Sequence, residues 1–498
     1  MNPSIWEATA KDVGFESLDS DLTVDVAIVG GGITGVTAAA LLTRTGLSVA
    51  LVEGQRIGRG TSGRSTGNLY TTVDQQLYTL AEKWNEQVAQ AVTQSRRAAL
   101  DQIASLIATH AIDCDYSVQP WHFFTETEDA DAEQTITKEQ AALSRAGLDA
   151  TLIDTLPLAL PIHRGVRLHG QAQLHPLDYV VGLAAAVRST SCRFFEGCPA
   201  LEIDDEQRIV KTARGTLSAK KIIMATHTPK GFHPIQTELG PYSEHGVAAS
   251  IDAPLPGGTY WSTGPKKYSL RGFSHNGKHY VLAIGSKHKT GQAEDTLACH
   301  RSLEEYLRAR FNIAQIKQRW SAQHFRPADG LPYIGPLRGS DDVYIATGFA
   351  TDGLVYGTLA AMLICDAING VSNPWAELYS ARRFTPLKSA ADFAKENANV
   401  ALQYAKDFLH NLPETTLESI APGEGKLIEH AGHKAAVCRK HNGEISALSA
   451  LCTHLRCVVH WNSAEQTWDC PCHGSRFGTD GEVLEGPALQ PLEKLPVG

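Results

Sequence analysis

The sequence predicts an α/β domain that includes an antiparallel β layer and is followed by a small all-β domain. Three observations support this fold class. The first half alternates β-branched runs with Ala-rich helical runs, as in 23–29, 33–44 and 49–53, which is typical of a parallel βαβ sheet. Short runs separated by Gly, Asn and Pro turns fill 242–326, which indicates an antiparallel sheet. After Pro413, short strands are punctuated by glycines, which favours a small β module.

Length, charge and hydropathy exclude several classes of protein. A chain of 498 residues exceeds what one core usually holds, so we expect two or three folding units. The formal net charge of -9, with scattered basic residues, argues against a nucleic-acid binder. The N-terminal stretch is neither basic nor apolar, and the apolar run near 359–365 is too short to span a bilayer. We therefore expect a cytoplasmic protein without membrane insertion that acts on small metabolites.

A glycine-rich turn near the N-terminus carries the first chemical signal. The strand 24–29 runs into Gly30-Gly-Gly32-Ile33-Thr34-Gly35, a helix follows, and the next strand closes on Glu53. Gly30 permits a tight turn, Gly32 lets backbone N–H groups approach a pyrophosphate, and Gly35 allows close packing of helix and strand. Glu53 is placed to accept hydrogen bonds from a ribose hydroxyl. An ordinary Gly-rich turn is the alternative, but the agreement of all these parts predicts a Rossmann-like dinucleotide-binding domain.

Three further segments resemble the D-amino-acid oxidase and glycine oxidase superfamily of FAD enzymes. They are the loop 56–64, the strand 219–225 and the stretch 348–354. In that family the last stretch, together with Trp320 and 329–335, aims a helix N-terminus at the flavin's pyrimidine edge, where it stabilises negative charge. The resemblance covers 22–384 and implies FAD, which we expect to be bound without a covalent link. The residues predicted to bind FAD are Gly30, Gly32, Ile33, Thr34, Gly35, Glu53, Gly54, Gly60, Thr61, Ser62, Arg64, Ala200, Ala225, Thr226, Gly348, Asp352, Gly353 and Leu354.

The same resemblance implies the reaction. Hydride passes from a carbon that bears an amine to the flavin, and water hydrolyses the resulting imine. Family members often hold a substrate carboxylate with Arg or Lys, which fixes its orientation. The candidates on the predicted substrate layer are Arg271, His288, Lys289 and Arg326, although each alone also fits a solvated surface charge. The stretch 286–291, in a turn after an apolar strand, stands out among them.

The C-terminal part contains a cluster of metal-binding residue types. Four of the ten cysteines lie between Cys452 and Cys472, which suggests metal ligation before disulfides. Two arms, Cys452-Thr-His454 and Cys470-Pro-Cys472-His473, can supply two thiolates to one iron and two imidazoles to the other, the Rieske [2Fe-2S] arrangement. A tetrahedral zinc site is the alternative for the same donors. The Gly and Ser that follow the second histidine, and the segment 486–488 that could cover a cluster, favour the Rieske interpretation.

The remaining cysteines of this region, Cys457 and Cys472, resemble a pair in the Rieske proteins of cytochrome bc-type complexes. In those proteins the pair forms a disulfide that ties the two cluster loops together. The resemblance also implies that Ser475 hydrogen-bonds a cluster sulfur and raises the reduction potential. Phe477 stands where a Tyr usually makes a similar bond, and Arg456 replaces a common Gly.

The combination resembles a bacterial family of Rieske-containing FAD-dependent oxidoreductases, which the segments 4–6 and 288–292 also match. We expect an FAD-dependent oxidoreductase at 1–385, with FAD-binding parts 22–241 and 327–385 and a substrate layer at 242–326. A helical connector at 386–412 and a Rieske domain at 413–498 follow.

In the function that we expect, an amine or amino-acid-like substrate reduces FAD. The cluster then passes single electrons to an unidentified external acceptor, and the connector sets its reach. Two alternatives stay open. One is a peroxide-forming amine or amino-acid oxidase with a structural Rieske domain. The other is an electron-transfer component that feeds an oxygenase, which the single dinucleotide fingerprint disfavours.

Overall fold

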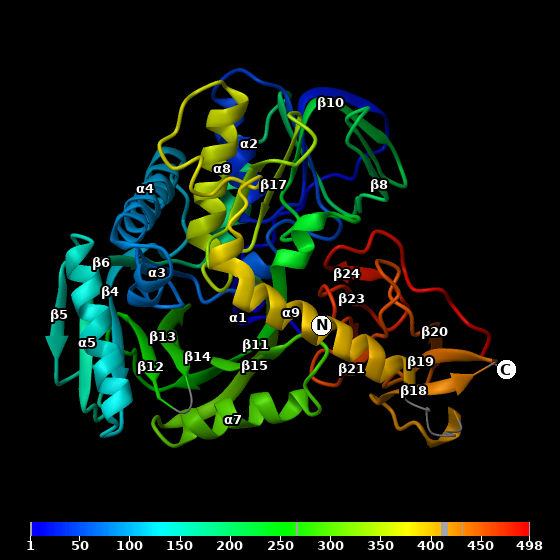
Figure 1. Cartoon of the computed structure of the whole chain (residues 1–498). Helices are drawn as coiled ribbons and strands as arrows, with labels where there is room; N and C mark the ends of the chain where they lie inside the picture. Colours follow the sequence, from blue (N-terminus) through cyan, green and yellow to red (C-terminus); the bar gives the residue numbers. More distant parts are fainter. Residues whose placement is uncertain (1, 265–266, 410–416, 431, 498) are drawn as a thin grey trace.

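The computed structural model describes residues 2–264, 267–409, 417–430 and 432–497 of the chain. The end of the predicted connector, 410–412, and Pro413 lie outside the described residues. Two modules are joined by one long helix (Figure 1). We call residues 2–385 the N-terminal module and residues 417–497 the C-terminal module.

The first sheet of the N-terminal module is the parallel sheet that the sequence predicts. Its strands follow the order β16-β17-β10-β1-β2-β7, parallel except for the β16–β17 pair, and the hairpin β8–β9 extends β10. Every residue of β2 and β17 is buried, as expected where helices and loops cover both faces. The strands are β1 (Leu22–Val29), β2 (Val49–Val52), β7 (Cys192–Phe195), β8 (Glu202–Asp204), β9 (Ile209–Lys211), β10 (Thr216–Met224), β16 (Tyr333–Pro336) and β17 (Val343–Thr347).

Two helices that follow strands of this sheet meet at their first turns. A Cβ at Gly357 in α8 would lie 2.7 Å from Cγ2 of Ile33 in α2, so the two helices approach closely. The first turns of α2 and α8 therefore lie side by side, next to the glycine-rich turn. The helices of this module are α1 (Ile5–Thr9), α2 (Ile33–Thr43), α3 (Leu77–Lys83), α4 (Glu86–His110), α5 (Ala130–Arg145), α6 (Pro176–Val187), α7 (Thr296–Arg308) and α8 (Gly353–Ile368).

The second sheet has the order β15-β11-β14-β13-β12-β4-β6-β3, with β5 beside β6. All of its pairs are antiparallel except β12–β4. Strands β3 to β6 come from the part that we assigned to FAD binding, so this layer is not confined to 242–326. The chain crosses between the two sheets more than once, which local patterns do not reveal. The strands are β3 (Asn68–Leu69), β4 (Ser117–Thr125), β5 (Ala150–Ile153), β6 (Arg164–Gln173), β11 (Leu239–Ile251), β12 (Thr259–Thr263), β13 (Tyr268–His275), β14 (Lys278–Lys289) and β15 (Ile313–Pro327).

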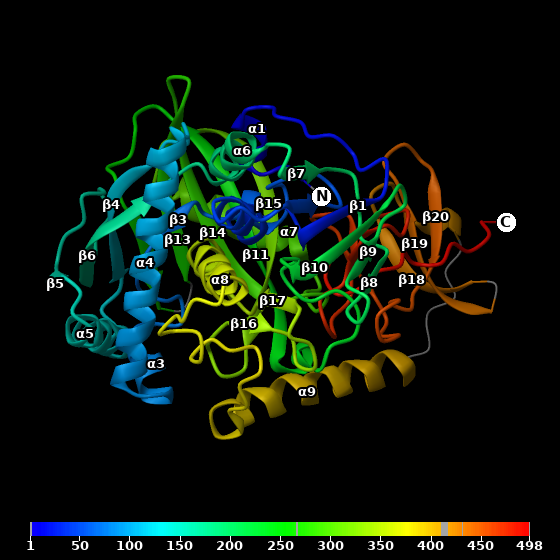
Figure 2. The same ribbon diagram turned by 90° about the horizontal axis from the view of Figure 1, so that it is seen from above.

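The described part of the predicted connector is the helix α9 (Pro386–Leu409), which extends from the N-terminal module towards the C-terminal module (Figures 1 and 2). Its side chains are bound to the N-terminal module. Asp392 pairs with Lys83 at 2.8 Å, and Nδ2 of Asn397 donates to the carbonyl of Thr237 at 3.0 Å. We expected the connector to set the reach of the cluster; in the structure, α9 is bound to the N-terminal module between Asp392 and Asn399.

The C-terminal module is built from two small antiparallel sheets, β18-β19-β20 and β21-β22-β23-β24. Its core includes Trp468 and Phe477 together with the cysteines of both cluster loops. The strands are β18 (Gly425–His430), β19 (His433–Arg439), β20 (Ile445–Ser449), β21 (His460–Asn462), β22 (Thr467–Asp469), β23 (Arg476–Phe477) and β24 (Val483–Glu485).

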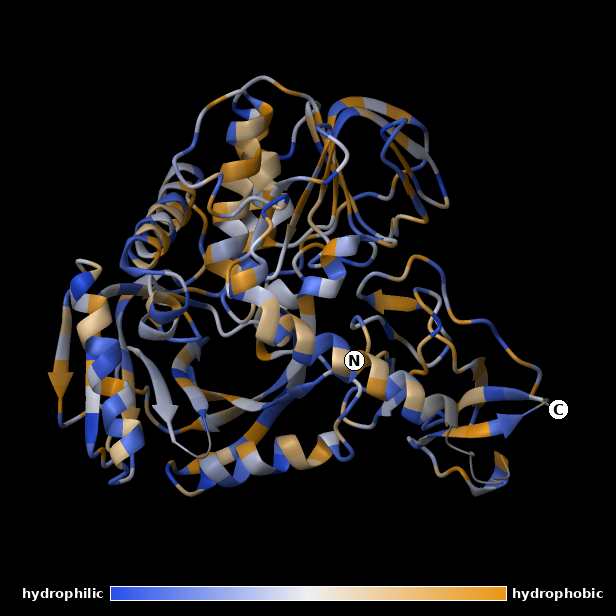
Figure 3. Cartoon of the chain, in the orientation of Figure 1, coloured by the Kyte–Doolittle hydropathy of each residue, from blue (hydrophilic) through white to orange (hydrophobic). Residues whose placement is uncertain are grey.

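Hydrophobic residues concentrate inside the N-terminal module, in the strands of the first sheet and in α8 (Figure 3). Within the described ranges, no helix is both long and apolar enough to cross a membrane.

Candidate functional site

The glycine-rich turn has the geometry that dinucleotide binding requires. Gly30 has a φ of +108°, and a Cβ there would overlap the carbonyl oxygen of Ala225 at the end of β10. A Cβ at Gly35 would overlap the carbonyl oxygen of Gly30. Gly32 caps α2 without a side chain, so nothing of its own screens the positive end of the helix. The turn therefore leaves room for a phosphate group where the backbone favours negative charge.

Glu53 lies at the end of β2, beside the turn. Its carboxylate accepts hydrogen bonds from the N–H groups of Gly31 at 2.7 Å and Gln55 at 2.9 Å. Burial raises its pKa above the usual value for a glutamate, and the two N–H groups oppose that change. The following residue, Gly54, approaches Pro199, which brings the predicted position Ala200 to the same edge of the sheet. The Glu53 carboxylate and the residues beside it fit the ribose part of a dinucleotide.

The second flavin loop includes a short 3-10 helix at Thr61–Arg64. The hydroxyl of Ser62 accepts the N–H of Ile33 at 3.0 Å, which joins the loop to the start of α2. The N-terminal segment holds the loop from outside, because Oγ of Ser4 donates to Gly63 O at 2.6 Å and Nε1 of Trp6 donates to Ser65 O at 2.7 Å. These contacts give the segment 4–6 a structural role.

The guanidinium of Arg64, a residue predicted to contact FAD, is bound to other parts of the protein. Its guanidinium donates to the carbonyls of Ser321 at 3.1 Å and Asn2 at 3.0 Å, and to the Glu465 carboxylate of the C-terminal module at 3.3 Å. Arg64 is 7% exposed and the Glu465 side chain is 0% exposed. The residue therefore links the flavin loop to the other module through a buried ion pair.

The third predicted FAD segment, Gly348 to Leu354, leads into α8. Asp352 is at the N-cap of the helix but makes no cap hydrogen bond. Its carboxylate instead accepts the hydroxyl of Tyr70 at 2.6 Å and the N–H of Asp74 at 3.3 Å, and lies 3.4 Å from the Arg96 guanidinium. Burial raises the pKa of Asp352, and Arg96 opposes that rise. The N–H groups of the first turn of α8 are thus left for another partner.

The four predicted substrate residues have different surroundings. Arg271 donates to the backbone carbonyls of Thr66 at 2.9 Å and Leu174 at 3.2 Å, and burial lowers its pKa to about 9. Lys289 pairs with Glu396 of α9 at 2.6 Å, and Arg326 is exposed. These contacts give Arg271 and Lys289 structural partners.

His288, the fourth of these residues, belongs to a chain of imidazoles. Its Nε2 lies 2.9 Å from Nε2 of His245, whose Nδ1 lies 3.2 Å from Nε2 of His300. Burial lowers the pKa of all three below the usual value for histidine. Donor atoms of His245, His288 and Cys299 lie within 4.8 Å of one another. Hydrogen bonds between neutral imidazoles already account for this arrangement, because Nδ1 of His288 bonds to Lys289 O at 2.9 Å.

Sequence reasoning missed a charged group beside the start of α8. Nζ of Lys287 lies 3.7 Å from the Asp74 carboxylate and 3.8 Å from that of Glu244. Asp74 in turn contacts Asp352 through its backbone. Burial raises the pKa of Glu244 to about 7, and Lys287 opposes that rise. Lys287 lies in the stretch 286–291 that stood out, but nothing in the sequence pairs it with residues of two other elements.

The predicted cluster ligands converge from two loops. Cys452 and Cys470 are buried and outside any disulfide, and the side chain of Cys452 contacts those of Cys470 and Ser475. The rings of His454 and His473 have centroids 5.1 Å apart. Within the described chain, Nε2 of His454 and Nδ1 of His473 are buried without a hydrogen-bond partner. A thiol pair beside an imidazole pair, with ring nitrogens left unsatisfied, fits a [2Fe-2S] cluster with two different irons.

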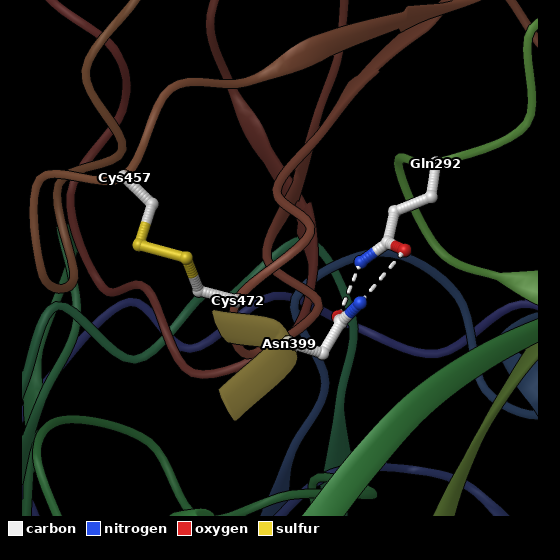
Figure 4. The surroundings of a disulfide bond; sticks show 4 residues. All are labelled: Gln292, Asn399, Cys457 and Cys472. Carbon is white, nitrogen blue, oxygen red and sulfur yellow. Dashed lines mark hydrogen bonds between the residues drawn. A yellow bond between two sulfur atoms is a disulfide. The ribbon is translucent and has the colours of Figure 1, made fainter. Parts of the chain in front are cut away.

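A disulfide between Cys457 and Cys472 joins the two loops, as the resemblance to bc-type Rieske proteins implied (Figure 4). Arg456, at the position of the common Gly, adopts a φ of +61°. The loop thus keeps a left-handed residue there although the side chain is large. Ser475 lies beside Cys452, and its hydroxyl accepts the N–H of Ala488 at 3.2 Å, so the segment 486–488 does pack against the cluster loops.

The two candidate cofactor sites meet at one interface. The hydroxyl of Thr61 in the flavin loop donates to the Glu485 carboxylate at 3.1 Å, and His227, which follows β10, contacts the same oxygen at 2.9 Å. Nζ of Lys230 donates to Gly486 O at 2.7 Å, and burial lowers its pKa to about 8. Residues of the flavin side therefore touch the segment that covers the cluster.

Comparison with known families agrees with this geometry. Residues 25–367 match the model of the FAD dependent oxidoreductase (DAO) family, and residues 412–496 match the Rieske [2Fe-2S] domain. The Bacillus subtilis protein YhfW, named for a Rieske 2Fe-2S iron-sulfur protein, is 32% identical over 98% of this chain and 97% of its own length.

The N-terminal module alone is similar to oxidoreductases without the second domain. Gamma-glutamylputrescine oxidoreductase of Escherichia coli is 26% identical over 74% of this chain and 89% of its own length. The structure of glycine oxidase from Geobacillus kaustophilus superimposes with a TM-score of 0.59 and 18% identity, over 73% of this chain and 99% of that one. At 18% identity, the similarity to glycine oxidase shows the fold alone.

Proposed function

The chain belongs to the FAD dependent oxidoreductase family and carries a Rieske [2Fe-2S] domain, and we propose that it oxidises an amine or amino-acid-like substrate and delivers the electrons through the cluster to an external acceptor. Its cofactors are FAD and the [2Fe-2S] cluster. When bound, the flavin accepts a hydride and the cluster accepts single electrons.

The chain's own residues hold and orient these groups. The turn at Gly30–Gly35 and the first turns of α2 and α8 offer backbone N–H groups to the phosphates and to the flavin. Glu53 offers a carboxylate to the ribose. Cys452, Cys470, His454 and His473 are the cluster ligands in this proposal. FAD is held without a covalent link.

The contact between the flavin loop and the cluster cover carries the proposal. Thr61 and His227 of the N-terminal module bind Glu485, and the next residues, 486–488, pack on Ser475 beside Cys452. A second contact, from Nε2 of Gln323 to Gly474 O at 2.8 Å, reaches the residue after His473. An acceptor held this close is present at a high effective concentration, which favours transfer within the chain over escape to dioxygen.

We place the substrate near Lys287, Glu244 and Asp74, in place of Arg271 and Arg326. The three charges lie next to the start of α8, the element that faces the flavin in this proposal. The carboxylates suit a substrate ammonium group and Lys287 suits a carboxylate, each through a charge-assisted hydrogen bond. Relatives named for gamma-glutamylputrescine and glycine support an amine or amino acid.

Anaerobic mixing of the purified protein with amines, N-methyl amino acids and amino acids tests this function. We expect one substrate class to bleach the flavin absorbance, with the cluster signal falling immediately afterwards. Bleaching without cluster reduction, together with stoichiometric hydrogen peroxide in air, would instead identify an oxidase with a structural Rieske domain. Bleaching by NADH alone would identify an electron-transfer component for an oxygenase.

We also propose a cytoplasmic location, following the expectation from the sequence. Cell fractionation tests it, and recovery of the chain with the membranes or the periplasm would contradict it.

A further inference from the structure

The segment 288–292, which matched the fused family and includes the substrate candidates His288 and Lys289, forms a turn against the connector. The N–H of Gln292 donates to Lys289 O at 3.2 Å, so the two ends of the turn are fixed relative to each other. Nζ of Lys289 pairs with Glu396 at 2.6 Å, and Nε2 of Gln292 donates to Oδ1 of Asn399 at 2.7 Å. Both partners lie on α9, one helical turn apart. Two side-chain contacts therefore join the turn to the helix.

The same turn packs against the second cluster loop. Gly291 has a φ of +70°, and a Cβ there would lie 2.7 Å from Asp469 O and 3.0 Å from Pro471 N. Lys289 and Glu396 line the same small cavity, of about 10 Å³, as Cys472 and His473 of the second cluster loop. The paired amides of Gln292 and Asn399 lie beside the Cys457–Cys472 disulfide (Figure 4). The loop that carries His473 thus rests on the turn and on the helix together.

We propose that this seam, which we define as Lys289, Gln292, Glu396 and Asn399, holds the cluster in one position, so that transfer from FAD requires no movement of the C-terminal module. The proposal rests on the function proposed above. The four residues are positioning residues, since they act through the loop Cys470–His473 and contact neither cofactor site directly. The module is fixed on other sides as well, by Arg64 bound to Glu465 and by Thr61 bound to Glu485.

The exposed fractions show that the seam is more than a surface contact. The side chains of Lys289 and Glu396 are 16% and 14% exposed, so their ion pair is partly shielded from water and salt. Glu396 also accepts the hydroxyl of Tyr242 at 2.8 Å, which anchors α9 to β11. Removing the carboxylate charge leaves a partly buried lysine without its anion, which weakens the seam more than the loss of an exposed pair would.

Flash photoreduction of the FAD in the complete protein tests the proposal without a known substrate. With EDTA as the electron donor and the bound FAD as the only photosensitiser, we expect cluster reduction in the native protein at a rate that added sucrose does not change. In the variant Gln292→Ala/Glu396→Gln, we expect this rate to fall by about tenfold and to depend on viscosity; a tenfold fall corresponds to about 1.4 kcal/mol of docking free energy. The control is Lys395→Gln, at an exposed position of the same helix.

Two further readouts separate positioning from a general loss of structure. The cluster's reduction potential and its visible spectrum should match the native values in the double variant, while hydrogen exchange of 469–474 should become faster. A native rate that falls with viscosity, or a double variant that transfers electrons at the native rate, would overturn the inference. If the native cluster is never reduced by photoreduced FAD, the proposed function fails instead.

Discussion

Replacing Arg64 by Met tests how much the ion pair between the modules contributes to stability. The Glu465 side chain is 0% exposed, and it would lose the cation that lies 3.3 Å away. Removing one partner of a buried pair typically costs about 3–5 kcal/mol, because the remaining charge stays buried without compensation. The N–H of Asn2 still donates to Glu465 at 3.2 Å, so we expect about 3 kcal/mol, the lower end of that range.

The double variant Arg64→Met/Glu465→Met provides the decisive comparison. Because both charges are gone and two apolar side chains replace them, we expect it to be more stable than Arg64→Met alone. The free energy of unfolding is measured by urea titration of the cofactor-loaded protein, followed by tryptophan fluorescence and by the visible signal of the cluster. Equal flavin content in all variants is the control. If the effects of Arg64→Met alone and Glu465→Met alone simply add up to that of the double variant, the reasoning about a coupled buried pair is wrong.

The remaining predictions concern pH, FAD binding and the disulfide. His122 and His175 are 0% exposed and burial lowers the pKa of each to about 4, so the unfolded chain binds more protons below about pH 6.5. The free energy of unfolding should therefore fall by about 1.4 kcal/mol per pH unit and per histidine as the pH drops from about 6.5 to about 4. Thermal unfolding at several pH values measures this fall, and its slope against pH should be shallower in His122→Gln. Gly35→Ala should abolish FAD binding while the cluster spectrum persists, since a Cβ overlaps Gly30 O; a yellow variant with native flavin content would contradict this. Cys457→Ser opens a link across a sequence separation of 15 residues, so we expect the C-terminal module to lose about 3 kcal/mol and to release iron faster on warming; unchanged iron retention would show that the loops do not need the bond.

The sequence was sufficient to predict those parts of the candidate site that are formed by short continuous segments. The turn from Gly30 to Gly35 and the two arms of cluster ligands are short segments in which geometry follows directly from residue type. Arg64 shows where this reasoning stops. It lies in a loop that the sequence singles out, yet its partner Glu465 is 401 residues away, and no pattern within the loop points to that contact.

The substrate region that we propose was hard to predict for the same physical reason. Lys287, Glu244 and Asp74 come from three separate elements, and their proximity depends on how the second sheet packs against α8. Arg271 has the charge that a substrate carboxylate requires, but backbone carbonyls occupy its guanidinium. Residue type alone does not distinguish an arginine that binds a ligand from one that satisfies carbonyls inside the fold.

The helix between the modules fixes the direction in which its side chains point as well as the distance that it spans. Glu396 and Asn399 face the turn together because three residues separate them, close to one period of an α-helix. Two extra residues before them would rotate both side chains by about 200° to the opposite side, whereas four would return them almost to the original direction, about 6 Å further along the axis. We therefore expect the length of this segment to be constrained by rotation as well as by distance, unlike that of a disordered linker.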